Sequence, residues 1–275
     1  MELNRRQLGG LFAGATLFTA ISPVVISPAF AASALKEFSP TGKGAADHSA
    51  YDAILKQYVS VDAAGYASVN YAALVGQRAA VDGYVASLIA IDPRQLSRIE
   101  AHAYWINLYN AKTLAIMLEN WPVKSIRDIN LGGGGFFGKG PWSKKLMTIA
   151  GTELSLDDVE HRIIRPIFNT PLSHYALNCA SYSCPNLMPR AYTAANLKSQ
   201  MQESATLYIN HPRGISIKDG EITASKIYSW YAGDFGGKAK LKDHWQSFAK
   251  PDLAAQIEAA SIGGYDYNWN ANVAG

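Results

Sequence analysis

The chain has only two cysteines among its 275 residues, Cys179 and Cys184, and both lie within one short segment. Its six histidines are scattered, without the paired spacing H-x3-H or H-E-x-x-H that zinc sites use. The sequence also lacks the G-x-S-x-G motif of serine hydrolases, and its glycine-rich stretch 132–140 lacks the ending of a phosphate-binding loop. We therefore expect no metal and no cofactor.

Charged residues are few as well. They make up 17% of the chain, the formal net charge is +3, and no basic run stands out. Nucleic-acid binding leaves a concentrated basic patch, so no nucleic-acid partner is expected. Beyond the N-terminal segment, no apolar stretch reaches the roughly 18 residues of a membrane span. The mature chain is predicted to have no membrane span, and its sequence carries no signal for an oligomeric state.

The N-terminal segment has the pattern of an export signal. Arg5 and Arg6 precede an apolar stretch over 8–26, and Ala29-Phe30-Ala31 offers a cleavage site before Ala32. We predict that residues 1–31 are a signal peptide and that the mature protein is periplasmic or secreted. The arginine pair indicates twin-arginine export, with a general-secretion signal as the alternative.

The remaining sequence favours a helix-rich α+β fold with a small antiparallel sheet. Residues 32–48 are expected to be a loose N-terminal segment and residues 49–275 a single domain, because no linker or repeat divides them. Apolar spacing and turn residues predict helices over 49–59, 77–90, 96–120, 194–210, 227–231 and 241–260, the last broken at Pro251. A hairpin over 215–223 is predicted with Asp219-Gly220 in its turn.

The helix over 96–120 is apolar on nearly all sides and should lie inside the fold. At 100° per residue, Glu100 and Asn107 lie about 20° apart, and Asn110 about 60° further round. Buried asparagines need partners, so these residues either pin a loop or orient groups in a cleft. On the second reading, Asn107 is a catalytic candidate and Glu100 and Asn110 contact the substrate.

A further helix opens at Ser155, which can form a capping box with Asp158, and ends near Pro166. Glu160 falls in the middle of its apolar arc, so we expect it to be buried near the cysteines. Burial suits a carboxylate to act as an acid or base, and a salt bridge to Arg165 or Arg190 is the alternative. His161 falls beside the arc, at the surface or at the edge of a cleft.

The segment 174–185 holds the candidate nucleophile. His174 to Cys179 is predicted to be a short buried strand, which would place His174 and Cys179 on opposite faces. The base for Cys179 is then expected from Glu160 or His161, with His174 as a secondary candidate. The loop 180–183, with Ser181, offers backbone N–H groups for an oxyanion, unless Cys179 and Cys184 form a disulfide.

Several stretches together resemble one family. Glu100 with 103–110, the segments 154–161 and 174–185, and residues 227–235 are similar to the motifs E-x-x-A-F-W-I-N-x-Y-N, L-S-L-D-D-I-E-H, H-F-A-L-x-C-x-S-x-S-C-P and I-F-x-W-Y-x-x-D-F of the DUF547 family, a domain of unknown function. The motifs occur in order over residues 50–235, and Tyr104 replaces the usual Phe. In the family pattern the position of Cys179 is firmer than that of Cys184, which implies that Cys179 acts without a disulfide partner.

The resemblance supplies no reaction. A distant likeness to papain-like or transglutaminase-like thiol folds rests on analogy in Cys, His and Glu content. The leading hypothesis is an exported thiol-dependent hydrolase or acyl transferase, acting on an amide- or thiol-containing small molecule or peptide, with the loop 132–142 as a lid. The rival is a non-catalytic binding domain with inert or bridged cysteines; a C-x4-C redox protein ranks third.

Overall fold

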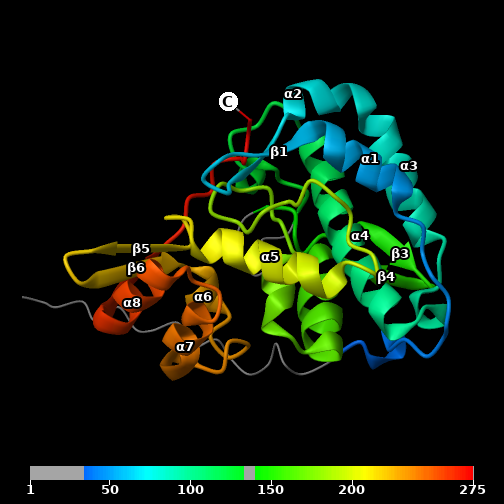
Figure 1. Ribbon diagram of the computed structural model, residues 1–275. Helices are drawn as coiled ribbons and strands as arrows, with labels where there is room; N and C mark the ends of the chain where they lie inside the picture. The colour runs from blue at the N-terminus through cyan, green and yellow to red at the C-terminus, as the bar shows by residue number, and fades with distance from the viewer. Residues whose placement is uncertain (1–33, 133–139, 275) are drawn as a thin grey trace, which may run out of the picture.

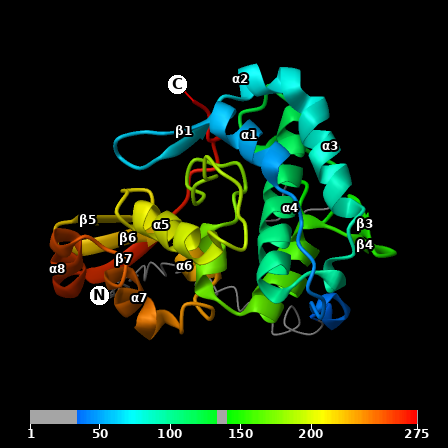
Figure 2. The same cartoon turned by 45° about the vertical axis from the view of Figure 1, so that its right-hand side comes forward.

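The computed structural model describes residues 34–132 and 140–274. It has a mixed helix-and-strand fold in which the long helix α4 (Arg98–Glu119) lies near the centre (Figure 1). Helix α3 (Arg78–Ile89) packs along α4, and α1 (Ser49–Tyr58) packs on α3 (Figure 2). The predicted signal peptide and most of the predicted lid, residues 133–139, lie outside the described residues.

Three small sheets complete the fold. The first two are antiparallel hairpins, β1 (Val59–Val61) with β2 (Ala67–Val69) and β3 (Met147–Ile149) with β4 (Thr152–Leu154). The third joins β5 (Ile215–Lys218), β6 (Glu221–Ser225) and β7 (Ser261–Asp266). Here β5 and β6 pair antiparallel but β6 and β7 pair parallel, so this sheet is mixed and differs from the predicted antiparallel one.

The predicted hairpin between β5 and β6 is confirmed. Asp219 and Gly220 both have positive φ, +51° and +77°. A two-residue turn with this backbone matches the twist of the paired strands, and Gly and Asp tolerate it.

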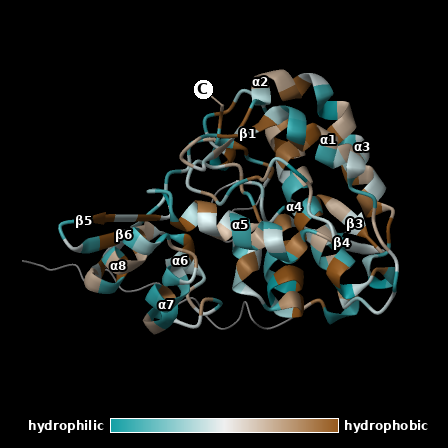
Figure 3. Ribbon diagram, in the orientation of Figure 1, coloured by the Kyte–Doolittle hydropathy of each residue, from teal (hydrophilic) through white to brown (hydrophobic). Residues whose placement is uncertain are grey.

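Helix α4 is buried along nearly its whole length, as predicted. Ser97 caps its N-terminus through a hydrogen bond from the Glu100 N–H, and every residue from Ala101 to Leu118 except Lys112 is buried. A helix that is apolar all round must be covered by other elements on every side. The other helices carry hydrophobic and hydrophilic residues along their lengths (Figure 3).

The remaining helices keep close to the predicted positions. Short helices flank the longer ones, and Pro251 starts a new helix at the predicted break. The elements are η2 (Lys36–Phe38), α2 (Tyr71–Leu74), η3 (Val75–Gln77), η4 (Pro93–Gln95), η5 (Ile126–Asp128), α5 (Leu197–Ile209), α6 (Ile227–Trp230), η8 (Lys238–Lys240), α7 (Leu241–Gln246) and α8 (Pro251–Ala259). No helix among the described residues is both long enough and apolar enough to cross a membrane.

The N-terminal segment expected to be loose is held against the core from Leu35 onward. The N–H of Leu35 donates to the carbonyl of Arg162 at 2.8 Å, and the Phe38 ring meets Trp105 of α4 edge-on at 5.4 Å. Burial of Leu35 and Phe38 offsets the conformational entropy lost on ordering this segment.

Two local predictions are corrected. The capping box forms, since the Asp158 N–H donates to Ser155 Oγ and the Ser155 N–H to Asp158 Oδ2, but the element it opens, η6 (Asp158–Phe168), is a π-helix. Hydrogen bonds in a π-helix join residues five apart, so Glu160 and Arg165 come to one side. Pro166, predicted to end this helix, lies inside it.

The predicted strand His174–Cys179 is wrong. Residues Pro171–Tyr175 form a 3-10 helix, η7, whose start is capped by Thr170 through the Leu172 N–H. The backbone of Ala176 and Asn178 is bonded by the Asn110 side chain. Backbone groups satisfied in this way are not available to a strand ladder.

Candidate active site

Two buried asparagines hold the loop that carries Cys179. Asn110 of α4 donates from Nδ2 to the carbonyl of Ala176 at 2.8 Å and accepts at Oδ1 from the Asn178 N–H at 2.8 Å. Asn178 then donates to the Pro185 carbonyl at 2.7 Å and accepts from the Ala180 N–H at 3.0 Å. The loop before and after Cys179 is therefore anchored to the central helix.

The residue after Cys179 has an unfavourable backbone. Ala180 has a φ of +59° and is buried. A non-glycine residue in this region costs about 1–3 kcal/mol and persists only where surrounding contacts impose it. The C-terminal segment supplies such contacts, since Tyr182 and Ser183 donate from their N–H groups to the carbonyls of Asn270 and Asn268. Backbone strain of this kind clusters at functional sites.

Two hydroxyl groups surround the sulfur of Cys179. Ser181 Oγ lies 3.2 Å from Cys179 Sγ and Tyr267 Oη lies 3.1 Å from it, and Ser181 Oγ also lies 2.9 Å from Tyr267 Oη. Burial raises the pKa of Tyr267 well above 10, and the nearby Cys179 raises it further. The Tyr267 hydroxyl therefore stays protonated and can donate to a thiolate.

The two cysteines are free thiols with opposite tendencies. Burial by itself raises the pKa of Cys179, but hydrogen bonds from Cys184, Ser181 and Tyr267 outweigh it and bring that pKa below its usual value. Burial and the neighbouring Cys179 both raise the pKa of Cys184. Of the two thiols, Cys179 is the one that ionises.

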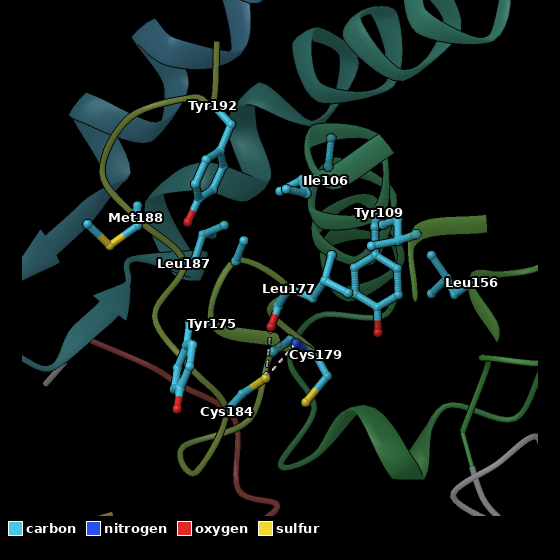
Figure 4. Close-up of a cluster of buried hydrophobic side chains, with 14 of the residues drawn as sticks. Ile106, Tyr109, Leu156, Tyr175, Leu177, Cys179, Cys184, Leu187, Met188 and Tyr192 are labelled. Carbon is cyan, nitrogen blue, oxygen red and sulfur yellow. Dashed lines mark hydrogen bonds between the residues drawn. The ribbon is translucent and has the colours of Figure 1, made fainter. Parts of the chain in front are cut away.

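The sulfur of Cys184 lies against the backbone of Cys179. It accepts from the Cys179 N–H at 2.9 Å and lies 3.5 Å from the Leu177 carbonyl (Figure 4). Figure 4 also shows both cysteines at the edge of a cluster of buried hydrophobic side chains, with Tyr109 reaching in from α4.

A small cavity opens beside these sulfurs. Its volume of about 30 Å³ holds about two water molecules. Its walls are mainly aromatic and aliphatic, with one carboxylate, one imidazole and the two thiols; the lining residues are Tyr109, Glu160, His174, Leu177, Cys179, Cys184, Pro185, Ile227, Trp230, Tyr231 and Tyr267. Only a small group of a bound molecule fits next to Cys179.

His174 is oriented in this cavity by a carboxylate. Its Nε2 lies 2.7 Å from Oδ2 of Asp234, and Arg165 grips the same carboxylate through Nε at 2.6 Å and Nη2 at 3.0 Å. Burial alone raises the pKa of Asp234, but His174 and Arg165 outweigh it and hold that pKa well below its usual range. An ionised carboxylate only accepts hydrogen bonds, so Nε2 is the ring nitrogen that donates to Asp234, which leaves Nδ1 as the other ring nitrogen. The ring also stacks on Tyr231, with centroids 4.3 Å apart.

Glu160 is buried and lines the same cavity as Cys179, as its place in the apolar arc predicted. His161 does not line the cavity. Its Nδ1 lies 3.3 Å from Arg165 Nη1 and 3.9 Å from the Glu160 carboxylate. Burial, more than its charged neighbours, lowers the pKa of His161, so this imidazole is neutral at pH 7.

The central helix contributes differently from expected. Asn107 and Glu100 do not line the cavity. Asn107 exchanges two hydrogen bonds with the backbone of Tyr192, so it pins a loop, and Glu100 lies in the first turn of α4, about 14 Å along the axis from Tyr109. The helical angles placed Asn107 and Glu100 near Asn110. A helical angle does not show which segment of the chain covers each side of the helix, so the prediction was wrong for these two residues. Asn110 holds the Cys179 loop but is not a lining residue.

Four aromatic lining residues and the carboxylate that orients His174 were missed: Tyr109, Trp230, Tyr231, Tyr267 and Asp234. The aliphatic lining residues Leu177, Pro185 and Ile227 were not predicted either. Of the first five, all except Tyr267 lie within the segments 103–110 and 227–235 that resemble family motifs, and that was the available signal. Tyr267 lies outside all of those segments and had no signal in the sequence.

Residues 93–209 match the family model described as "Protein of unknown function, DUF547". This chain contains a DUF547 domain. The domain carries α4, η6, η7, the Cys179 loop and α5, whereas Asp234 and Tyr267 reach the cavity from segments after it. Neither a curated protein nor a solved structure is found to match the chain, so the papain-like likeness stays a prediction.

Metal ligation has no candidate in the described part of the chain. Across residues 34–132 and 140–274, no three His, Cys, Asp or Glu side chains are grouped to hold a metal ion.

The anchoring of the Cys179 loop leads to a paired prediction. Asn110→Ala and Asn107→Ala each leave buried backbone groups unpaired, so each should destabilise the fold by about 1–3 kcal/mol in urea unfolding. Only Asn110→Ala frees the Cys179 loop, so only it should also change the alkylation rate of Cys179. Equal alkylation rates in the two variants would contradict this role.

Proposed function

We propose that this protein is an exported thiol-dependent hydrolase or acyl transferase acting on an amide- or thiol-containing substrate. One observation carries the proposal: a single cavity holds Cys179, whose thiolate is favoured by two hydroxyl groups, together with His174 oriented by Asp234. A nucleophile, a base and a group that orients the base are the parts that covalent acyl transfer requires. Export rests on the arginine pair and cleavage site of residues 1–31.

His174 is the base in this proposal, in place of Glu160 or His161. With Nε2 held by Asp234, Nδ1 is the atom that exchanges a proton with the thiol or with the leaving group. The argument that separated His174 from Cys179 assumed a strand, and η7 removes that assumption. His161 has no place on the cavity wall.

The acyl step needs a donor for the developing oxyanion. In the loop 180–183, the N–H groups of Ala180, Tyr182 and Ser183 are already bonded within the protein, so these three are not that donor. Tyr109 lines the cavity, and burial raises its pKa well above 10, so its hydroxyl stays protonated. We assign the oxyanion to the Tyr109 hydroxyl, because preorganised donors stabilise such charge best in a buried site.

Trapping of an acyl-enzyme tests the proposal. Phenyl thioacetate is a small activated acetyl donor, and intact-mass and peptide-mass analysis of the reduced protein should locate acetyl on Cys179. Cys184→Ser should still be acetylated and Cys179→Ser should not.

The rival function is a non-catalytic binding domain, which the small cavity and the 6% exposure of Cys179 favour. Absence of acetyl, or acetyl on Cys184, would establish that reading in place of the enzyme.

A further inference from the structure

The cavity beside Cys179 has the composition of a cation site. Four aromatic residues line it, Tyr109, Trp230, Tyr231 and Tyr267, together with the carboxylate of Glu160. Aromatic rings attract cations through their π faces, and aromatic cages are a common way to bind ammonium groups. The Glu160 carboxylate is not needed to activate the thiol, since an ionised Glu160 opposes formation of the Cys179 thiolate.

Glu160 is the unusual member of this wall. It is only 6% exposed. Among the described residues, His161 is the only basic side chain within 4 Å of its carboxylate, and that imidazole is neutral at pH 7. Arg165 on the same π-helix interacts electrostatically with Glu160, but its hydrogen bonds to a carboxylate go to Asp234. Within the described residues no cation is hydrogen-bonded to this buried carboxylate, so it carries a desolvation cost that a bound cation would relieve.

We infer that this cavity binds the primary ammonium group of an acceptor substrate, with Glu160 as its counter-ion. The inference rests on the proposed acyl chemistry and makes the protein a transferase to amines. Space for about two water-sized groups admits an ammonium and its adjoining methylene, and excludes a quaternary ammonium.

The resulting step balances. The ammonium gives one proton to the Glu160 carboxylate, which frees the nitrogen lone pair to attack the carbonyl carbon of the thioester on Cys179. The nitrogen–carbon bond forms, the carbon–sulfur bond breaks, and its electron pair leaves on sulfur. The second nitrogen proton passes to Nδ1 of His174, and the thiolate is received by the hydroxyls of Ser181 and Tyr267.

Titration of the Cys179→Ser protein with ethylammonium, monitored by protein-observed NMR, tests the site without any reaction. Ethanol and tetramethylammonium serve as the neutral and the oversized controls. We expect ethylammonium to bind at the cavity residues, and ethanol and tetramethylammonium to bind at least about tenfold more weakly. Adding Glu160→Gln should weaken ethylammonium binding about ten- to hundredfold.

The ligand series keeps the test decisive if Glu160→Gln does not fold. Equal binding of ethylammonium and ethanol, or no binding of either, would overturn the amine site even if Cys179 is acetylated by phenyl thioacetate. The reverse outcome, amine binding without acetylation of Cys179, would uphold a cation site and refute the acyl chemistry. If both the amine site and the acyl chemistry are upheld, ethylamine should accelerate loss of the acetyl group from wild-type Cys179 and yield N-ethylacetamide.

Discussion

Replacing His174 by Gln should slow acetylation of Cys179 by phenyl thioacetate about 100- to 10,000-fold, the usual contribution of a general base. The physical reason is that Nδ1 is the lone pair that accepts the thiol proton, while Asp234 holds the ring by Nε2. Stopped-flow or mass-resolved acetylation rates measure the effect. Asp234→Asn should lower the rate in the same direction, because an amide no longer selects the productive tautomer.

His161→Gln is the matched control, since His161 is also a buried imidazole on a neighbouring element but does not line the cavity. Its acetylation rate should stay within about threefold of wild type. Circular dichroism should show that all three variants are folded. A large loss in His161→Gln with little change in His174→Gln would reverse the assignment of the base.

The second large effect concerns the ionisation of Cys179. In the reduced folded protein, iodoacetamide should label Cys179 at pH values below about 8.5, the pKa of an ordinary thiol, and leave Cys184 unlabelled. The reason is that Tyr267 can donate to the Cys179 thiolate and Ser181, which donates to Tyr267, also lies 3.2 Å from the sulfur, whereas burial and the neighbouring Cys179 hold Cys184 as a thiol. Peptide mass analysis across pH 5–9 gives both profiles.

Removing either hydroxyl group should raise the pH at the midpoint of Cys179 labelling. A hydrogen bond to a charged group contributes about 1.5–3 kcal/mol, so Ser181→Ala and Tyr267→Phe should each raise the midpoint by about one pH unit or more. The sign follows from which form the donors favour: they stabilise the thiolate, so losing one favours the thiol. Protein unfolded in guanidinium chloride is the control and should label both cysteines with one ordinary profile. A folded-state midpoint at or above that profile would remove Cys179 as a nucleophile.

Much of the local organisation follows from the sequence alone. The buried central helix, the Ser155–Asp158 capping box, the Asp219-Gly220 hairpin and the burial of Glu160 were all predictable, because they depend on residue spacing and local hydrogen bonding. The motifs around Cys179 also identified the DUF547 family before any fold was known.

Other features depend on segments far apart in the chain. Asp234 meets His174 across 60 positions, and Tyr267 meets Cys179 across 88. Periodicity shows that a face is buried but not which distant segment covers it. The segment 174–179 has an apolar pattern suited to a strand, yet Asn110 bonds the backbone of Ala176 and Asn178, and the segment is the end of a 3-10 helix followed by a loop.

The sequence by itself therefore determined which residues are chemically notable: the two cysteines, Glu160 and the histidines beside them. Only the tertiary structure decided which of them meet. It brings His174, Glu160 and Cys179 to one cavity and gives Asn107 to a loop. The reason is physical: side-chain chemistry is a local property, whereas the pairing of a base with its nucleophile is set by the packing of the whole core around α4.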